Sequence, residues 1–97
     1  MVYSLTDKLK FAENPKIQIK DKIVTVKAEA ETALKVYDVI NKESEATSIL
    51  KSYEIIFSDK DRKVISGLKL SMEDFITLMK VAVSLCIGED PDAEQSE

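Results

Sequence analysis

The sequence predicts an α+β domain in which an N-terminal β-hairpin packs on three to four helices, with helix dominating. Three observations lead to this fold class. Apolar and polar residues alternate over residues 16–27, as in a strand pair with one buried face. From about Ala30 onward the apolar residues recur every three or four positions, which is the helical period. Serine followed three residues later by an acid, at 58–61 and 71–74, is typical of helix starts.

The hairpin is predicted over KIQIKDKIVTVK, with a two-residue loop at Asp21 and Lys22. This loop length places four apolar side chains on the face toward the helices, because successive strand residues point to opposite faces. Asp-Lys lacks the glycine that two-residue hairpin turns favour, so a longer loop stays open as an alternative. The predicted cross-strand pairs are Ile19 with Val24 and Ile17 with Val26.

A third strand is also allowed upstream of the hairpin. Leu9 and Phe11 alternate with lysines within KLKFAE, and Asn14-Pro15 would end such a strand. Because a lone hairpin is only marginally stable, the strands are expected to pack against the helices.

Four helical segments follow the hairpin. The first is expected to be supported by the (i, i+4) pairs Glu31–Lys35 and Asp38–Lys42, and Ser44 is expected to cap the second. Gly67 predicts a short third helix, and Gly88 is the expected C-terminal cap of the last. The predicted core stripe of the first helix is Ala30, Ala33, Leu34, Tyr37 and Ile40; that of the second is Ala46, Ile49, Leu50, Tyr53, Ile56 and Phe57; that of the third is Val64, Ile65 and Leu68.

The last helix has more apolar residues than one core face needs. Its expected core stripe is Phe75, Leu78, Met79, Ala82, Leu85 and Cys86, yet Ile76, Val81, Val83 and Ile87 lie off that stripe. A helix that is apolar all round is buried on more than one side. Either the other elements wrap this helix, or one side is an interface with a second subunit or another protein. Val81, Val83 and Ile87 are the candidate partner-binding residues.

Composition argues against an enzyme. The 97 residues include no His, two Gly and one Cys, so the usual neutral-pH acid/base and the glycines of a phosphate-binding loop are missing. Cys86, on an apolar stripe, is read as a core residue. No catalytic, cofactor-binding or metal-binding residue is predicted, and no cofactor. With no bridge-forming cysteine pair, no signal-peptide pattern and no long apolar run, we expect a cytoplasmic protein without membrane contact.

The net charge of −4 is unevenly distributed. Residues 89–97 carry five acids and no base, which leaves residues 1–88 nearly neutral. We therefore expect a single folded domain over residues 1–88 and an acidic, disordered tail over 89–97. Residues 1–27 contain six lysines and no arginine, a pattern that indicates a solvent-exposed surface. No nucleic-acid binding is therefore predicted.

The order of these segments resembles the small tail assembly chaperones of long-tailed bacteriophages and prophages. The resemblance covers about residues 9–90: a hairpin, helical segments, and a last helix that starts with the sequence Leu70-Ser71-Met72-Glu73-Asp74-Phe75. It implies a non-enzymatic protein of the bacterial host cytoplasm that binds the tape-measure protein or the tail tube protein. The alternative is a small regulatory protein-binding module from a mobile element. Self-association through the last helix is predicted separately, from the apolar surplus between Val81 and Ile87.

Overall fold

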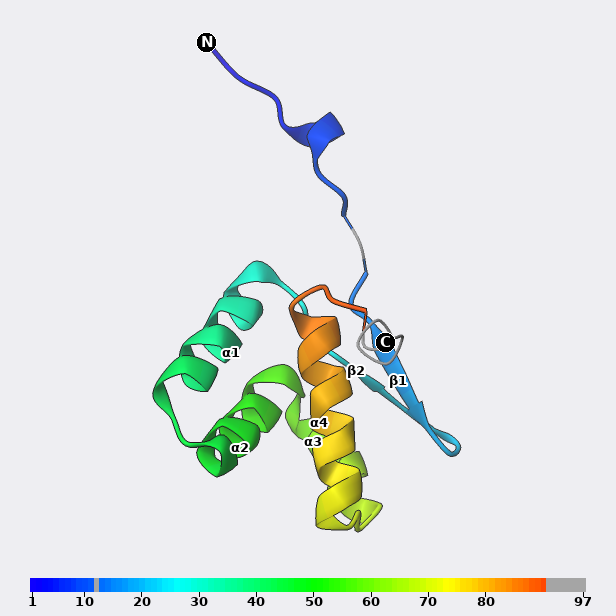
Figure 1. The fold of residues 1–97 in the computed structure, drawn as a ribbon. Helices are drawn as coiled ribbons and strands as arrows, with labels where there is room; N and C mark the ends of the chain where they lie inside the picture. Colours follow the sequence, from blue (N-terminus) through cyan, green and yellow to red (C-terminus); the bar gives the residue numbers. More distant parts are fainter. Residues whose placement is uncertain (12, 91–97) are drawn as a thin grey trace.

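The computed structural model describes residues 1–11 and 13–90 (Figure 1). It shows the predicted α+β, helix-dominated fold, with an antiparallel hairpin followed by four helices. The acidic tail expected over residues 89–97 lies outside the described residues from position 91 onward. The elements are a 3-10 turn at Thr6–Lys8, β1 at Lys16–Ile19, β2 at Lys22–Thr25, α1 at Ala30–Lys42, α2 at Glu45–Ile56, α3 at Asp59–Gly67 and α4 at Met72–Cys86.

The hairpin forms with its predicted buried face, but the predicted register is wrong by two residues. Ile17 pairs with Val24 and Ile19 with Lys22, so the two-residue loop consists of Lys20 and Asp21. Lys20 takes a positive φ of 55°, which is the backbone conformation that the first loop residue of a tight hairpin turn requires. Because side chains alternate with a period of two, a two-residue shift leaves every side chain on its predicted face.

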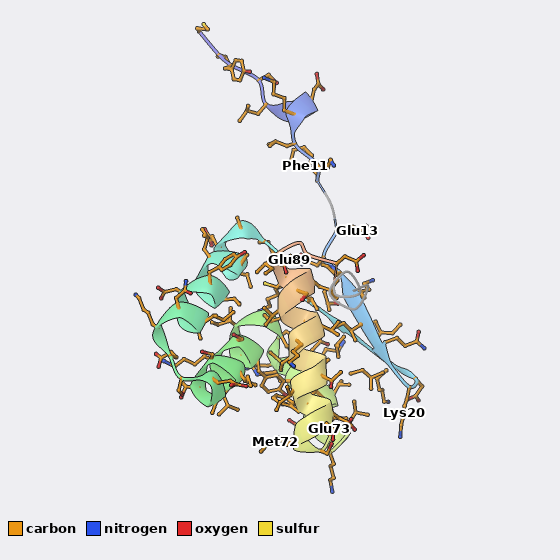
Figure 2. All side chains as sticks on the ribbon, viewed as in Figure 1. Phe11, Glu13, Lys20, Met72, Glu73 and Glu89 are labelled. Atoms are coloured by element: carbon orange, nitrogen blue, oxygen red, sulfur yellow. The ribbon has the colours of Figure 1, made fainter. Side chains whose placement is uncertain are left out.

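The third strand predicted around Leu9 and Phe11 is not formed in the described residues. Thr6–Lys8 forms a 3-10 turn, and both Leu9 and Phe11 are exposed. The chain direction is set at Asn14, whose Oδ1 accepts a hydrogen bond from the Ala28 N–H and whose Nδ2 donates to Glu29. From that anchor, residues 1–11 extend away from the hairpin and helices, and Figure 2 shows Phe11 far from the helices.

The core lies between the inner face of the hairpin and the helices. Val24 and Val26 are fully buried, and Ile17 and Ile19 pack against the core from the edge strand. The outer edge of β2 is tied to the helices: the Thr25 N–H donates to Asp61 and the Lys27 N–H to the Ile56 carbonyl. The buried core residues are Val24, Val26, Val36, Ile56, Phe57, Ile65, Leu78, Met79, Ala82 and Cys86.

Two helices are rotated relative to their predicted stripes. In α1, Val36 is fully buried, whereas Leu34, Tyr37 and Ile40 of the predicted stripe are 66%, 47% and 44% exposed. In α2, Ser48 and Ser52 are buried, and Leu50 of the predicted stripe is 60% exposed. Periodicity identifies a helix, but neighbouring elements decide which arc of it is covered. Of the two predicted ion pairs on α1, Asp38–Lys42 forms at 2.9 Å, whereas the described residues contain no Glu31–Lys35 pair.

The helix ends follow their capping residues. Ser44, Ser58 and Ser71 each accept a hydrogen bond from the backbone N–H three residues later. Gly88 has a φ of 83°, and its N–H bonds to the Leu85 carbonyl while the Glu89 N–H bonds to that of Ser84. This pair of bonds is a Schellman motif, which requires a left-handed residue at that position. The predicted caps and the short third helix are confirmed.

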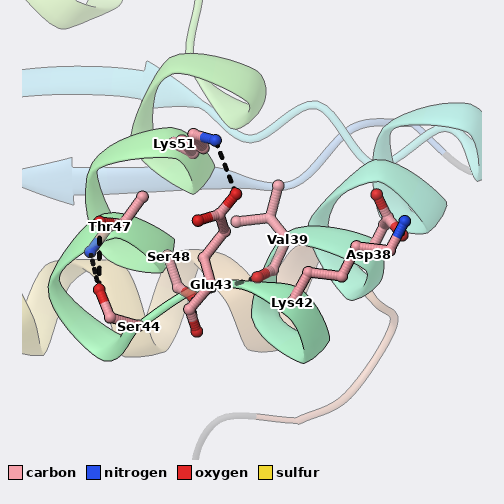
Figure 3. Close-up of polar contacts among 8 residues, drawn as sticks. All are labelled: Asp38, Val39, Lys42, Glu43, Ser44, Thr47, Ser48 and Lys51. Atoms are coloured by element: carbon pink, nitrogen blue, oxygen red, sulfur yellow. Dashed lines mark hydrogen bonds and ion pairs between the residues drawn. The ribbon is translucent and has the colours of Figure 1, made fainter.

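The two buried serines of α2 are in different hydrogen-bonding situations. Ser48 Oγ lies 3.2 Å from the Val39 carbonyl and 3.4 Å from that of Glu43, so it satisfies the end of α1 (Figure 3). Ser52 Oγ is buried and has no hydrogen-bond partner among residues 1–11 and 13–90. Its unsatisfied hydroxyl carries a desolvation penalty.

We expect Ser52→Ala to raise the free energy of unfolding by up to about 1 kcal/mol, because it removes a buried unsatisfied hydroxyl at nearly unchanged volume. The matched change Ser48→Ala should lower it by about 1 kcal/mol, because it removes the donor to the α1 carbonyls. Urea unfolding of both variants measures the difference. A loss of stability in Ser52→Ala as large as that in Ser48→Ala would contradict the assignment.

Candidate functional site

An open groove of about 600 Å³ runs between the end of α1, the start of α2 and one side of α4. Its floor is mostly apolar, and its rim is charged. Concave apolar surfaces with a few polar groups are the usual places where proteins bind partners or ligands. The lining residues are Ile40, Glu43, Glu45, Ser48, Ile49, Ser52, Ile76, Met79, Lys80, Val83, Ser84, Ile87 and Glu89.

One ridge of α4 faces this groove. Ile76, Lys80, Val83 and Ile87 are spaced i, i+4, i+7 and i+11, so they share one face of the helix. The adjacent arc of α4, with Leu78, Met79, Ala82 and Cys86, is buried in the core. The apolar surplus of α4 is therefore divided, because one arc faces the core and another lines an open groove.

The structure brings together two of the three predicted partner-binding residues. Val83 and Ile87 both line the groove, and both are only partly buried. Val81 does not line it. Residues two apart on an α-helix are separated by about 200° around the axis, so Val81 and Val83 lie on nearly opposite sides of α4.

The groove also includes residues that sequence reasoning assigned elsewhere. The sequence predicts Ile40 and Ile49 in the core stripes of their own helices, and Ile76 off the core stripe of α4. The spacing of Ile76 from Val83 and Ile87 is the signal that identifies it as part of the same ridge. Nothing in the spacing of the α1 or α2 residues distinguishes a groove wall from a core face, because both positions are apolar.

The rim of the groove is acidic. Glu43, Glu45 and Glu89 contribute carboxylates, against a single cation from Lys80. Glu43 is paired with Lys51 of α2 at 2.8 Å, an exposed contact that joins the α1–α2 loop to α2 (Figure 3). Figure 2 shows Glu89 at the end of α4. A partner with basic residues flanking an apolar stripe would match this rim.

The titratable groups of the described residues do not gather into a reactive centre in this groove. Cys86 lies in the core, and burial, with a smaller contribution from the charge of Glu29, raises the pKa of its thiol above the ordinary range. A buried thiol with a raised pKa holds little of the thiolate that reacts. Across residues 1–11 and 13–90, no three His, Cys, Asp or Glu side chains are grouped to hold a metal ion.

A second hollow lies beside α2 and α3, around Tyr53, Asp59 and Arg62. Arg62 has a structural role there, because its guanidinium donates to the carbonyls of Glu54 and Phe57 and pairs with Asp59. The Tyr53 hydroxyl donates to the Arg62 carbonyl at 3.0 Å. These bonds close the end of α2 onto the start of α3, so this hollow is a helix junction.

Comparisons of the chain with protein families, with curated proteins and with solved structures give no match. The described helices are all too short or too polar to span a membrane. The candidate site is therefore identified by its geometry alone: it is an open apolar groove with an acidic rim.

Proposed function

We propose that this protein is a non-enzymatic tail assembly chaperone of a phage or prophage, which binds the tape-measure protein, or the tail tube protein, in the host cytoplasm. The observation that carries the proposal is the groove between α1, α2 and α4, whose floor is apolar and open. The order of the elements supports the choice of this family over other binding proteins. A hairpin is followed by helices, and the last helix, α4, begins at Met72 within the stretch Leu70–Phe75.

A helical segment is the partner that fits the groove best. The ridge on α4 presents Ile76, Val83 and Ile87 over about 16 Å, which is the length of three helical turns. An amphipathic helix uses residues at i, i+3, i+4 and i+7 to fill such a groove. A tape-measure protein, as a long helical polypeptide, offers many such segments, and covering their apolar faces would keep it soluble before assembly.

Binding in this groove should depend mainly on apolar contact. The rim carboxylates of Glu43, Glu45 and Glu89 are exposed, and exposed ion pairs contribute little and are screened by salt. We therefore expect a complex that is only weakly salt-dependent. Neither nucleic acid nor a membrane is a partner in this proposal, because the folded body is nearly neutral and the groove is apolar.

The test is co-expression with the large coiled-coil-rich protein encoded next to this gene. The expected result is that more of this protein stays in the soluble fraction, and that a complex survives gel filtration. Ile40→Lys should abolish the complex, because it places a charge on the groove wall at a side chain that is already 44% exposed and so tolerates the change. Ile23→Lys, on the exposed outer face of the hairpin, is the matched control and should keep the complex.

Two outcomes of this experiment would contradict the proposal. If the large protein is equally soluble alone and no complex forms, the chaperone proposal fails, and a regulatory module from a mobile element, with a different protein partner, takes its place. If Ile40→Lys binds as well as Ile23→Lys does, the groove is not the binding site. Circular dichroism of both variants confirms that each is folded.

A further inference from the structure

The N-terminal arm, residues 1–11, is an apolar segment that none of the other described residues covers. Its hydrogen bonds to described residues stay within the arm, such as that from the Lys8 N–H to the Leu5 carbonyl at 2.8 Å. The radius of gyration is 15.0 Å, against about 13 Å for a compact chain of this length, and Figure 1 shows the arm extending from the rest of the fold. Its large apolar side chains are at least 49% exposed: Met1, Val2, Tyr3, Leu5, Leu9 and Phe11.

The arm matches the groove in length and spacing. As a helix its eleven residues would span about 16 Å, which equals the length of the α4 ridge from Ile76 to Ile87. Thr6–Lys8 already forms one helical turn in the middle of the arm. Continuing this turn in both directions would bring Val2, Leu5 and Leu9 onto one face, at the spacing that helices use to fill an apolar groove.

The charges of the two surfaces are also complementary. The arm carries Lys8 and Lys10 against Asp7, whereas the groove rim is acidic. The free edge of β1 is the other surface on which an extended arm could pair. The charged side chain of that edge is Lys16, so the lysines of the arm would meet a like charge there. Charge therefore favours the groove over the strand edge.

The anchor at Asn14 directs the arm outward instead of back onto its own body. Asn14 is held by its hydrogen bonds to Ala28 and Glu29, both at 3.1 Å, and the arm leaves from this point away from α1, α2 and α4 (Figure 1). Because the arm points away from the groove of its own chain, it is placed to bind the groove of a second copy. Reciprocal exchange of two arms is an isologous contact, which closes as a dimer with two-fold symmetry.

We infer that the N-terminal arm of one copy docks in the α1–α2–α4 groove of a second copy, so that the protein forms an arm-exchanged dimer. The inference goes beyond the proposed function, because it concerns the contact of the chain with itself and holds whatever the client is. It adds a consequence for the client: a helix that binds the groove must displace the arm.

The first test is light scattering of the full chain. Wild-type protein should have a mass of about 22 kDa, twice the 10.9 kDa of one chain. The double variant Leu5→Asp/Leu9→Asp should raise the dimer dissociation constant by about 100-fold or more, since two leucines lose their burial. Both side chains are exposed within one chain, so this variant keeps its fold. Ile23→Asp, equally exposed on the hairpin, is the control and should remain dimeric.

The second test uses charge reversal. Lys8→Glu/Lys10→Glu should weaken the dimer by about two- to tenfold, and adding Glu45→Lys/Glu89→Lys should restore it. In a mixture of isotope-labelled and unlabelled wild-type protein, filtered nuclear Overhauser contacts should join Leu5 and Leu9 to Val83 and Ile87 of the other copy.

Three results would overturn the inference: a wild-type monomer at high concentration, a dimer unaffected by Leu5→Asp/Leu9→Asp, or arm contacts to Lys16 and Gln18 of β1 in place of the groove. The client test is separate. If the dimer forms but no client binds, only the proposed function fails. If the client binds a protein that is monomeric, only the dimer fails.

Discussion

Replacing Phe57 by Ala should lower the free energy of unfolding by about 3–5 kcal/mol, the largest effect that we expect for a single substitution in this protein. Phe57 is fully buried directly after α2, and its ring lies 5.9 Å from that of Tyr53. Truncation removes the apolar burial and leaves a cavity that the surrounding core residues fill only in part. Small domains have a total stability of only about 5–15 kcal/mol, so such a loss leaves the variant near its unfolding threshold.

Urea unfolding followed by circular dichroism measures this loss. Leu50→Ala is the matched control, since Leu50 belongs to α2, which Phe57 directly follows, and to the same predicted stripe, but is 60% exposed. We expect the control to change stability by less than about 0.5 kcal/mol. Equal losses in the two variants would mean that the rotation of α2 described above is wrong.

The second large effect is expected at Asp61. Its Oδ2 accepts a hydrogen bond of 2.9 Å from the Thr25 N–H, which ties the outer edge of β2 to the first turn of α3. Asp61→Ala leaves that partly buried N–H without its acceptor, and hydrogen bonds to charged groups contribute about 1.5–3 kcal/mol. We therefore expect a loss of about that size in the free energy of unfolding.

Asp59→Ala is the matched control, because Asp59 also lies in the first turn of α3 but is exposed and, within the part of the chain that the structure describes, pairs only with Arg62. Its loss should stay below about 1 kcal/mol. Asp61→Asn keeps an acceptor oxygen, so it should retain part of the stability that Asp61→Ala loses. Amide hydrogen exchange at Thr25 gives a local measure, and should accelerate in Asp61→Ala but not in Asp59→Ala. Unchanged exchange would show that this bond does not hold the strand.

The hairpin shows which features of a sheet can be read from sequence. Alternation determined that Ile17, Ile19, Val24 and Val26 share a face, and the structure confirms it. The predicted cross-strand partners were wrong, because Lys20-Asp21 and Asp21-Lys22 both lack glycine and a shift by two residues keeps every side chain on its face. The loop position was decided by Lys20 adopting a positive φ, which is a property of the folded turn.

The sequence by itself determined the order of elements, the helix starts at Ser44, Ser58 and Ser71, and the end of the last helix at Gly88, because capping depends on residues within one turn of the helix end. It also indicated that α4 has more apolar surface than one core face needs. These features are local in the chain, so a linear pattern contains them.

Only the tertiary structure decided which apolar residues are core and which line the groove. Ile40 and Val36 belong to the same helix and are similar in character, yet Val36 is buried and Ile40 lies on the groove wall. The two residues are one turn apart on nearly the same face, so their burial differs with position along α1: Val36 lies midway along the helix, whereas Ile40 lies in its last turn beside the groove. Where α2 and α4 cover α1 is set by packing among residues far apart in sequence. The groove and the outward course of the N-terminal arm arise in the same way, since each depends on contacts that no single helical or strand period contains.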